Sequence, residues 1–139
     1  MVWFLNQILN FVNFLNFVFQ YLSEEYAEDV QWDKSKILIY TIDIEVASDN
    51  GFPDIRLANA PITSLTVHNS INDVYYVFGT GEYTPNDPEK TIKYFRSDNE
   101  EEMMQLFLDW WKDNPPHIIT GWNCKFFDMP YIINRIMYL

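Results

Sequence analysis

The clearest pattern along the chain is an alternation of apolar and acidic positions within residues 37–46. Ile42 and Ile44 occupy one set of alternate positions, while Asp43 and Glu45 occupy the other. Because successive side chains of a β-strand point to opposite faces, this pattern predicts a strand whose two carboxylates lie on one face. The β-branched and aromatic residues of the segment support the same prediction.

Four shorter segments downstream carry patterns typical of β-strands. Residues 61–69 and 74–78 alternate apolar and polar positions around a short turn, which predicts a hairpin beside the first strand. Residues 91–96 predict a further short strand. Residues 117–123 follow a predicted helix and contain the apolar pair Ile118-Ile119, so we expect a buried strand parallel to the first, as in a β-α-β crossover.

Two segments show helical periodicity. Apolar side chains recur on one stripe through residues 97–114, and Ser97 with Glu100 matches a capping box. The acidic residues near the start of this helix suit the positive end of its dipole, and we interpret them as solvated and without a catalytic role. Residues 131–139 predict a second helix, with Pro130 in its first turn.

Residues 1–22 form an atypical segment rich in Asn and Phe, with apolar residues at helical spacing. Three interpretations compete: a signal or membrane anchor, an amphipathic docking helix, and low-complexity sequence foreign to the domain behind it. Frequent amide side chains and the absence of any Lys or Arg before Lys34 disfavour an anchor. We favour the third interpretation, expect the segment to be helical, and place residues 23–139 in one domain.

The charge of the chain restricts how it could meet nucleic acid. Among 139 residues, 20 are acidic and 9 are basic, giving a formal net charge of −11. This balance argues against binding nucleic acid by bulk electrostatics, although metal ions could supply positive charge locally. The one cysteine, Cys124, excludes an internal disulfide and fits a reducing compartment.

Three carboxylates are candidate metal ligands: Asp43 and Glu45 on the first strand, and Asp128 where the last predicted strand gives way to a helix. If the two strands are parallel neighbours, Asp128 comes near the acidic pair at the edge where open α/β sheets place their sites. Mg²⁺ favours carboxylate oxygen, which suggests a two-metal phosphodiesterase. The alternatives are a solvated acidic strand face and, for Asp128, a helix N-cap.

Two motifs carry a resemblance to a known family. They are Ile42-Asp43-Ile44-Glu45, and Gly121-Trp122-Asn123 followed by Phe127-Asp128-x-Pro130-Tyr131-Ile132. Together they resemble the 3′→5′ proofreading exonuclease domain of family B DNA polymerases, most closely those of T4-like bacteriophages. The resemblance implies a ribonuclease H-like α/β fold, a mixed β-sheet flanked by helices. It makes residues 23–139 a partial exonuclease domain, truncated at the C-terminus.

The resemblance also implies roles for the matching positions. Asp43, Glu45 and Asp128 would be catalytic metal ligands for two Mg²⁺ or Mn²⁺ ions. Phe127 would contact the terminal base or sugar, with core packing as its alternative, and Asn123 would bind near the phosphate or merely cap a turn. The implied substrate is the 3′ end of single-stranded or frayed DNA, in the cytoplasm of an infected host cell, with no membrane involved.

One family motif has no counterpart in the expected place. The third motif, Tyr-x-x-x-Asp, supplies the last metal ligand, and no such pattern follows Asp128. We therefore expect a fragment of a DNA polymerase whose exonuclease is weak or inactive alone, and a second chain carrying the rest is a possible partner. The alternative is a non-catalytic interaction or remnant fragment without nuclease activity.

Overall fold

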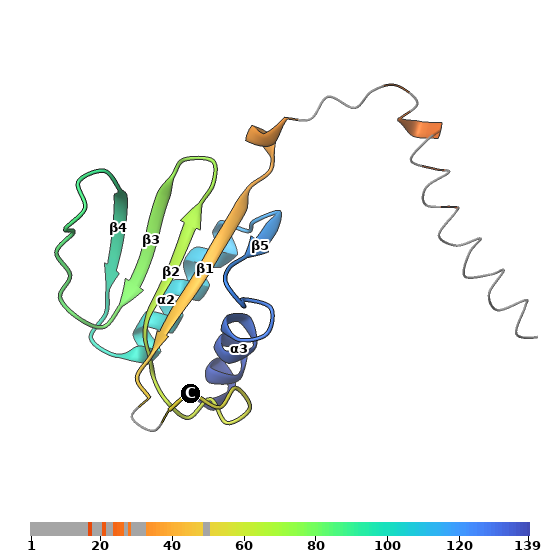
Figure 1. Ribbon diagram of the computed structural model, residues 1–139. Coiled ribbons are helices and arrows are strands. Elements are labelled where there is room, and N and C mark those ends of the chain that lie inside the picture. The colour runs from red at the N-terminus through yellow and green to blue at the C-terminus, as the bar shows by residue number, and fades with distance from the viewer. Residues whose placement is uncertain (1–16, 18–20, 22–23, 27, 29–32, 49–50) are drawn as a thin grey trace, which may run out of the picture. The chain divides into compact units, whose positions relative to one another are not determined.

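The computed structural model describes residues 17, 21, 24–26, 28, 33–48 and 51–139. The chain divides into two units, residues 1–33 and 34–139, and the second contains the sheet and helices described below (Figure 1). The segment 1–22 lies almost wholly outside the described residues. Its helical conformation and the domain boundary after residue 22 therefore stay predictions.

One five-stranded mixed sheet organises the second unit, in the order β4-β3-β2-β1-β5 (Figure 1). Antiparallel pairing joins β1 to β2 and β2 to β3, whereas β5 runs parallel to β1 and β4 parallel to β3. The predicted first strand, the hairpin beside it, the short strand and the parallel pairing of the last strand are all confirmed. The strands are β1 (Ile39–Val46), β2 (Ile62–Asn69), β3 (Val74–Gly79), β4 (Thr91–Arg96) and β5 (Ile118–Thr120).

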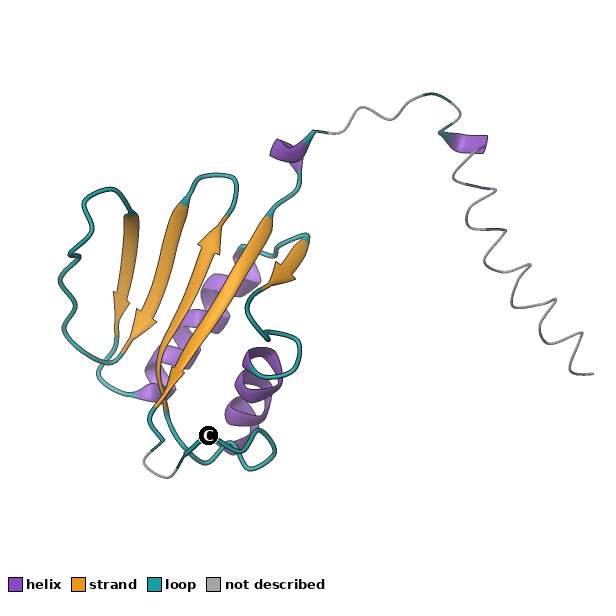
Figure 2. Cartoon of the chain, viewed as in Figure 1, coloured by secondary structure: helices purple, strands orange, loops and turns teal. Residues whose placement is uncertain are grey.

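Two helices, α2 (Glu100–Asp113) and α3 (Asp128–Tyr138), pack on the same face of this sheet (Figures 1 and 2). A short 3₁₀ helix, η1 (Lys34–Lys36), precedes β1. The α/β class, with a mixed sheet and flanking helices, is confirmed. Side chains buried between sheet and helices include Tyr40, Ile42, Ile44, Leu65, Val67, Phe78, Met103, Phe107, Tyr131 and Ile132. Within the described part of the chain, no helix covers the opposite face.

The start of α2 differs from the capping box predicted at Ser97. Asn99 is the N-cap, and its side chain accepts a hydrogen bond of 2.9 Å from the Glu102 N–H. Ser97 instead prolongs the β3–β4 ladder, because both its N–H (3.0 Å) and its hydroxyl (3.1 Å) donate to the Gly79 carbonyl. The helix therefore begins two residues later than the sequence pattern predicts.

The interpretation of the first-turn acids of α2 as solvated is wrong for Glu100. Its side chain is only 12% exposed and forms an ion pair with Arg135 of α3, with 2.5 Å between Nη2 and Oε2. Glu100 Oε1 also accepts a hydrogen bond of 2.7 Å from the Ile62 N–H, and Arg135 donates to the Ala58 carbonyl (2.9 Å). This buried pair joins both helices to the loop that leads into β2.

The prediction that the strand after α2 is buried is also wrong. β5 has the predicted parallel pairing, but Ile118 and Ile119 are 46% and 39% exposed. The strand lies at the edge of the sheet, and α3 packs against β1 rather than over it. The position of β5 in the sheet, which its apolar composition does not reveal, determines this exposure.

Candidate metal centre

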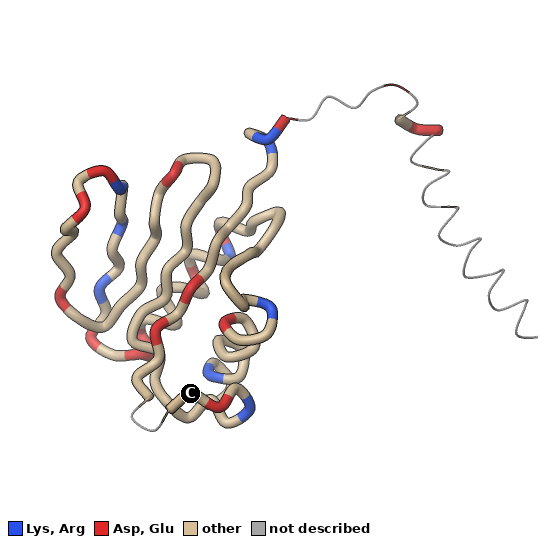
Figure 3. Tube along the Cα trace, in the orientation of Figure 1, with Lys and Arg blue, Asp and Glu red and all other residues tan. Residues whose placement is uncertain are grey.

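The alternation along β1 places Asp43 and Glu45 on the open face of the sheet, as predicted. Their neighbours Ile42 and Ile44 are buried in the core, whereas both acids are exposed. Figure 3 marks the acidic positions of this strand. Two carboxylates thus project from one side of β1, on a face that the described helices leave uncovered.

Asp128 reaches the same strand through an unpaired edge. The pairing of β5 with β1 ends at Thr120, opposite Thr41, which leaves the edge of β1 free beyond that point. Asp128 occupies this edge, where its Oδ1 accepts a hydrogen bond of 3.2 Å from the N–H of Ile44. Because Ile44 lies between Asp43 and Glu45 in the strand, the structure brings Asp128 beside the acidic pair.

The alternative role of Asp128 as a helix N-cap does not match the structure. Phe127 is the N-cap residue of α3 and makes no side-chain capping bond, while Asp128 is the first helical residue. The Asp128 side chain is directed to β1 and is 2% exposed. It therefore supports the free strand edge and not the helix terminus.

The turn between β5 and α3 depends on Gly121. A Cβ at this position would collide with the carbonyl oxygen of Ile42 and lie 2.9 Å from the Cβ of Cys124. Asn123 then adopts the left-handed conformation (φ 58°), and its carbonyl accepts hydrogen bonds from the N–H groups of Phe126 and Phe127, each 2.9 Å long. This tight turn delivers Asp128 to Ile44.

Replacing Gly121 by alanine is expected to destabilise the fold by about 1–3 kcal/mol, the usual range for overpacking a close contact. The added methyl would press on the backbone of β1, which cannot move aside as a flexible side chain can. Urea denaturation measures the change. Gly81→Ala is the matched control, since a Cβ there meets nothing within 4 Å. Equal stabilities of the two variants would contradict the close-approach argument.

The environment of Asp128 favours its neutral form. Burial raises the pKa of its carboxyl above the ordinary value, and the negative charge of Asp43 raises it further, while hydrogen bonds from its own N–H and that of Ile44 act in the opposite direction. The two carboxyls therefore interact electrostatically. A cation held between them would favour the ionised form of Asp128.

The three candidate side chains carry the kind of donor atom that a hard divalent cation binds. Asp43, Glu45 and Asp128 offer only carboxylate oxygens, which Mg²⁺ prefers. However, no three His, Cys, Asp or Glu side chains within the described ranges are grouped closely enough to hold a metal ion. The structure thus gathers the three candidates along β1 without closing them into a coordination sphere.

The two candidate substrate contacts lie on the same turn. Asn123 is exposed at the left-handed position. Phe127 is half-buried, with its ring centroid 5.5 Å from that of Tyr131 and 4.7 Å from that of Phe52. Packing is therefore what the structure records for Phe127, while Phe52 is 77% exposed. The sequence analysis did not assign Phe52 to the site. Its position shortly after β1 and directly before Pro53 could have indicated that it lies there.

A cavity of about 530 Å³ between β5 and α3 contains none of the three carboxylates. Its lining is mostly apolar and includes Cys124, Met129 and Ile133, with Lys125 among the few polar residues. The cavity therefore does not take part in the candidate metal centre. In the portion of the chain that the structure describes, no helix is both long and apolar enough to cross a membrane.

Comparison with known proteins gives consistent matches. Residues 9–139 match the family model for the exonuclease domain of DNA polymerase family B. The DNA-directed DNA polymerase of Escherichia phage RB69 is 34% identical over 144 residues, and that of Enterobacteria phage T4 is 30% identical over 144 residues. Both alignments cover 87% of this chain and 16% of the phage protein.

A third match covers a shorter part of the chain. The DNA polymerase catalytic subunit of Human herpesvirus 8 type P (isolate GK18) is 32% identical over 113 residues, which is 78% of this chain and 11% of that protein. The chain thus spans less than a fifth of the length of each of these curated relatives.

Proposed function

Because the chain belongs to the exonuclease domain family of family B DNA polymerases, we propose that it removes nucleotides from DNA 3′ ends by two-metal hydrolysis, as in proofreading. The observation that supports this proposal is the hydrogen bond between Asp128 and the N–H of Ile44, the residue that separates Asp43 from Glu45 along β1. Two carboxylates of β1 and one from the start of α3 thereby lie along the same strand. The DNA substrate is part of the proposal.

The chain's own groups would act as ligands and positioners. Asp43 and Glu45 would hold the cations from the open face, and Asp128 from the strand edge, with Glu45 also orienting the attacking water. Two divalent cations, when bound, would supply an activated water and stabilise the leaving 3′ oxygen. Binding would require Asp128 to be ionised, which its surroundings otherwise oppose.

Aromatic side chains beside the centre would position the DNA end. The exposed ring of Phe52 packs against the ring of Phe127. A terminal base could therefore stack on Phe52, with Phe127 holding the Phe52 ring in place. Asn123 would meet the phosphate from the turn. These contacts would supply binding that the net charge of −11 does not.

Activity is expected to be slow, because the three carboxylates are not closed around a common ion within the described residues. Misplacement of a reacting group by about 1 Å can reduce a rate about a hundredfold. A second chain that contributes a further carboxylate would accelerate the reaction. Such a partner stays a prediction. A location in the cytoplasm also stays a prediction.

The proposal is tested with single-stranded DNA labelled at the 3′ end or, separately, at the 5′ end. In Mg²⁺ or Mn²⁺, the 3′ label is expected to appear first as mononucleotide, and a chelator should stop its release. Initial loss of the 5′ label, or release that persists in chelator, would contradict 3′→5′ metal-dependent hydrolysis. No release from either end would favour a non-catalytic interaction or remnant fragment.

A further inference from the structure

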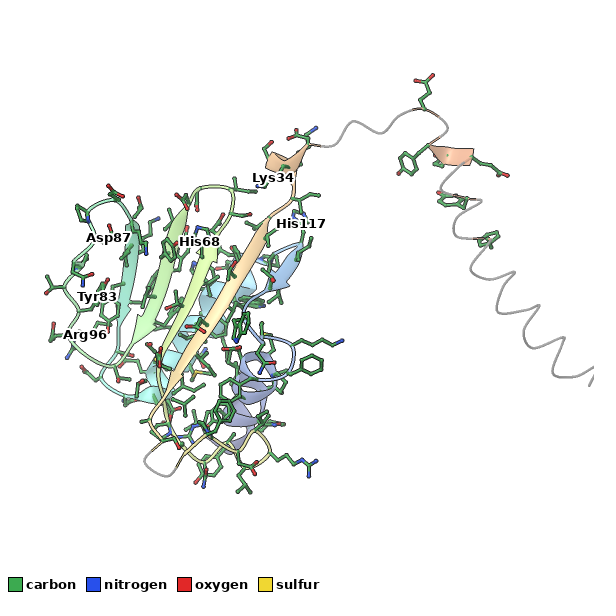
Figure 4. The ribbon with its side chains drawn as sticks, viewed as in Figure 1. Lys34, His68, Tyr83, Asp87, Arg96 and His117 are labelled. Carbon is green, nitrogen blue, oxygen red and sulfur yellow. The ribbon has the colours of Figure 1, made fainter. Side chains whose placement is uncertain are left out.

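The loop that leads into β2 is attached to α3 by side chains of that helix (Figure 4). We call residues 51–61 the Phe52 loop, because the exposed ring of Phe52 lies near its start. Three side chains of α3 each donate a hydrogen bond to a backbone carbonyl of this loop: Tyr131 to Ala60 (2.8 Å), Asn134 to Ile55 (2.8 Å) and Arg135 to Ala58 (2.9 Å). The loop is therefore bound at three points to one helix.

The three donors lie on the part of α3 that also carries a candidate metal ligand. Tyr131 is followed by Asn134 and Arg135 at positions i+3 and i+4, which are neighbours on a helix surface. Asp128 precedes Tyr131 by three residues and contacts β1 at Ile44. One rigid helix thus connects the Asp128 carboxyl to the Phe52 loop.

The backbone of the Phe52 loop needs support from outside the loop. Its own hydrogen bonds close a turn: Asp54 Oδ1 accepts from the N–H groups of Arg56 (2.7 Å) and Leu57 (3.0 Å), and the Asp54 carbonyl accepts from the Ala58 N–H (2.9 Å). Ala58 adopts a left-handed conformation (φ 41°), which is unfavourable for a residue with a Cβ. Such a conformation persists only where its surroundings hold it, and it is frequent at binding sites.

Asn134 is the donor whose contact concerns the loop alone. Tyr131 is fully buried in the core, and Arg135 forms the ion pair with Glu100. Asn134 is half-buried, and within the described residues the one hydrogen bond of its side chain is that to the Ile55 carbonyl. Loss of its amide would therefore release the middle of the Phe52 loop without opening the core or breaking the ion pair.

The position of the Phe52 ring depends on this attachment. The ring centroids of Phe52 and Phe127 are 4.7 Å apart, and Phe52 is 77% exposed, so one side of its ring packs while the rest stays accessible. Phe127 directly precedes Asp128 in the chain. Release of the loop at Ile55, three residues after Phe52, would let the exposed ring move relative to Asp128.

We propose that Asn134 is a positioning residue for the DNA 3′ end. Its hydrogen bond to the Ile55 carbonyl holds the Phe52 loop so that the Phe52 ring keeps a fixed place relative to Asp128. The inference rests on the proposed function, in which a terminal base stacks on Phe52 and cations bind beside Asp128. Asn134 acts through Phe52 and does not itself touch the DNA.

The test measures binding of single-stranded DNA with 2-aminopurine as its 3′-terminal base and a phosphorothioate in the last linkage to slow hydrolysis. Stacking lowers the fluorescence of 2-aminopurine, so titration with the full chain in Mn²⁺ reports both affinity and stacking. Phe52→Ala is expected to weaken binding about tenfold and to abolish most of the quenching. Asn134→Leu has nearly the same shape but cannot donate, and is expected to weaken binding about threefold, with reduced quenching, because the ring is displaced and not removed.

Two further variants separate positioning from a general effect on the fold. Asn114→Leu is the matched control, because the Asn114 amide also donates to a backbone carbonyl, that of Trp110 (2.8 Å), at a half-buried position of the chain. It should leave binding and quenching unchanged. The double variant of Phe52→Ala and Asn134→Leu should bind as Phe52→Ala does, since without the ring there is nothing left for Asn134 to position.

The inference would be overturned by equal binding and quenching in Asn134→Leu and the wild type, or by additive losses in the double variant. Equal quenching in the wild type and Phe52→Ala would overturn it as well, because Phe52 would then not be the stacking surface. The titration requires no turnover, so its result is separate from that of the nuclease assay. Release of nucleotides from DNA with unaltered binding in Asn134→Leu would retain the proposed function and remove the role of Asn134.

Discussion

Replacing Asp128 by asparagine is expected to reduce metal-dependent nucleotide release about a hundredfold or more while leaving the protein folded. The amide oxygen of asparagine can still accept the hydrogen bond from the Ile44 N–H, so the turn would stay attached to β1. The substitution removes only the negative charge that a cation needs. The assay is release of a 3′ label in Mn²⁺, with Asp113→Asn on the exposed end of α2 as control.

The pH dependence of stability should reveal the raised pKa of the Asp128 carboxyl in the folded protein. Burial raises its folded-state pKa above the ordinary 3.8, so the folded protein retains a proton that the unfolded chain has lost. The stabilisation is complete below pH 3.8 and is lost as the pH rises through the raised value. Asp128→Asn lacks this change, so its Tm is expected to fall less than that of the wild type over that interval.

Added Mn²⁺ provides a third measurement on the same variant. At neutral pH a bound cation would stabilise the ionised carboxylates, and a ligand at 100 times its Kd contributes about 2.7 kcal/mol. The Tm of the wild type is therefore expected to rise with Mn²⁺, and that of Asp128→Asn to rise less. Full nuclease activity in Asp128→Asn, or equal Tm shifts, would show that Asp128 is only a support for the strand edge.

Replacing Arg135 by methionine is expected to lower the free energy of unfolding by about 3–5 kcal/mol. The Arg135 and Glu100 side chains are 7% and 12% exposed, so the substitution would leave the Glu100 carboxylate buried without its cation. It would also leave the Ala58 carbonyl without the hydrogen bond from Arg135. Urea denaturation measures the loss.

Two further variants distinguish a buried ion pair from a general effect of removing an arginine. Arg96→Met breaks ion pairs with Glu82 and Asp98 at the surface and is expected to change stability little. Adding Glu100→Gln to Arg135→Met removes the unpaired charge and should recover part of the loss. A large effect of Arg96→Met, or no recovery in the double variant, would contradict this account.

The sequence predicted those parts of the fold that depend on local pattern. Alternation identified β1 and the β2–β3 hairpin, and order along the chain predicted the parallel pairing of β5. The pattern also predicted which face of β1 carries Asp43 and Glu45, because that depends only on strand periodicity. These are relations between neighbouring residues or successive elements.

What the sequence could not predict depends on contacts between distant residues. The hydrogen bond from Ile44 to Asp128 joins positions 84 apart, and the partner of Glu100 lies 35 residues away. Local pattern does not reveal that Arg135 lies beside Glu100, so Glu100 has the same pattern as a solvated acid in the first turn of a helix. The exposure of β5 likewise follows from its position at the edge of the sheet, and Phe52 gains its place from the fold of its loop onto Phe127.

The long sequence separation between β1 and β5 has a consequence for the order of folding. The hydrogen bond between the Leu38 N–H and His117 Nδ1 spans 79 residues, whereas the β2–β3 hairpin pairs residues that are at most 15 positions apart, as Ser64 and Gly79 are. Local contacts form sooner, because closing a long loop costs more entropy before any contact compensates it. While the chain is being synthesised, Asp43 and Glu45 are therefore in place long before Asp128 exists. The proposed metal centre could form only after β5 has paired with β1 and Asp128 has reached Ile44, so a chain that lacks these contacts is expected to have no nuclease activity.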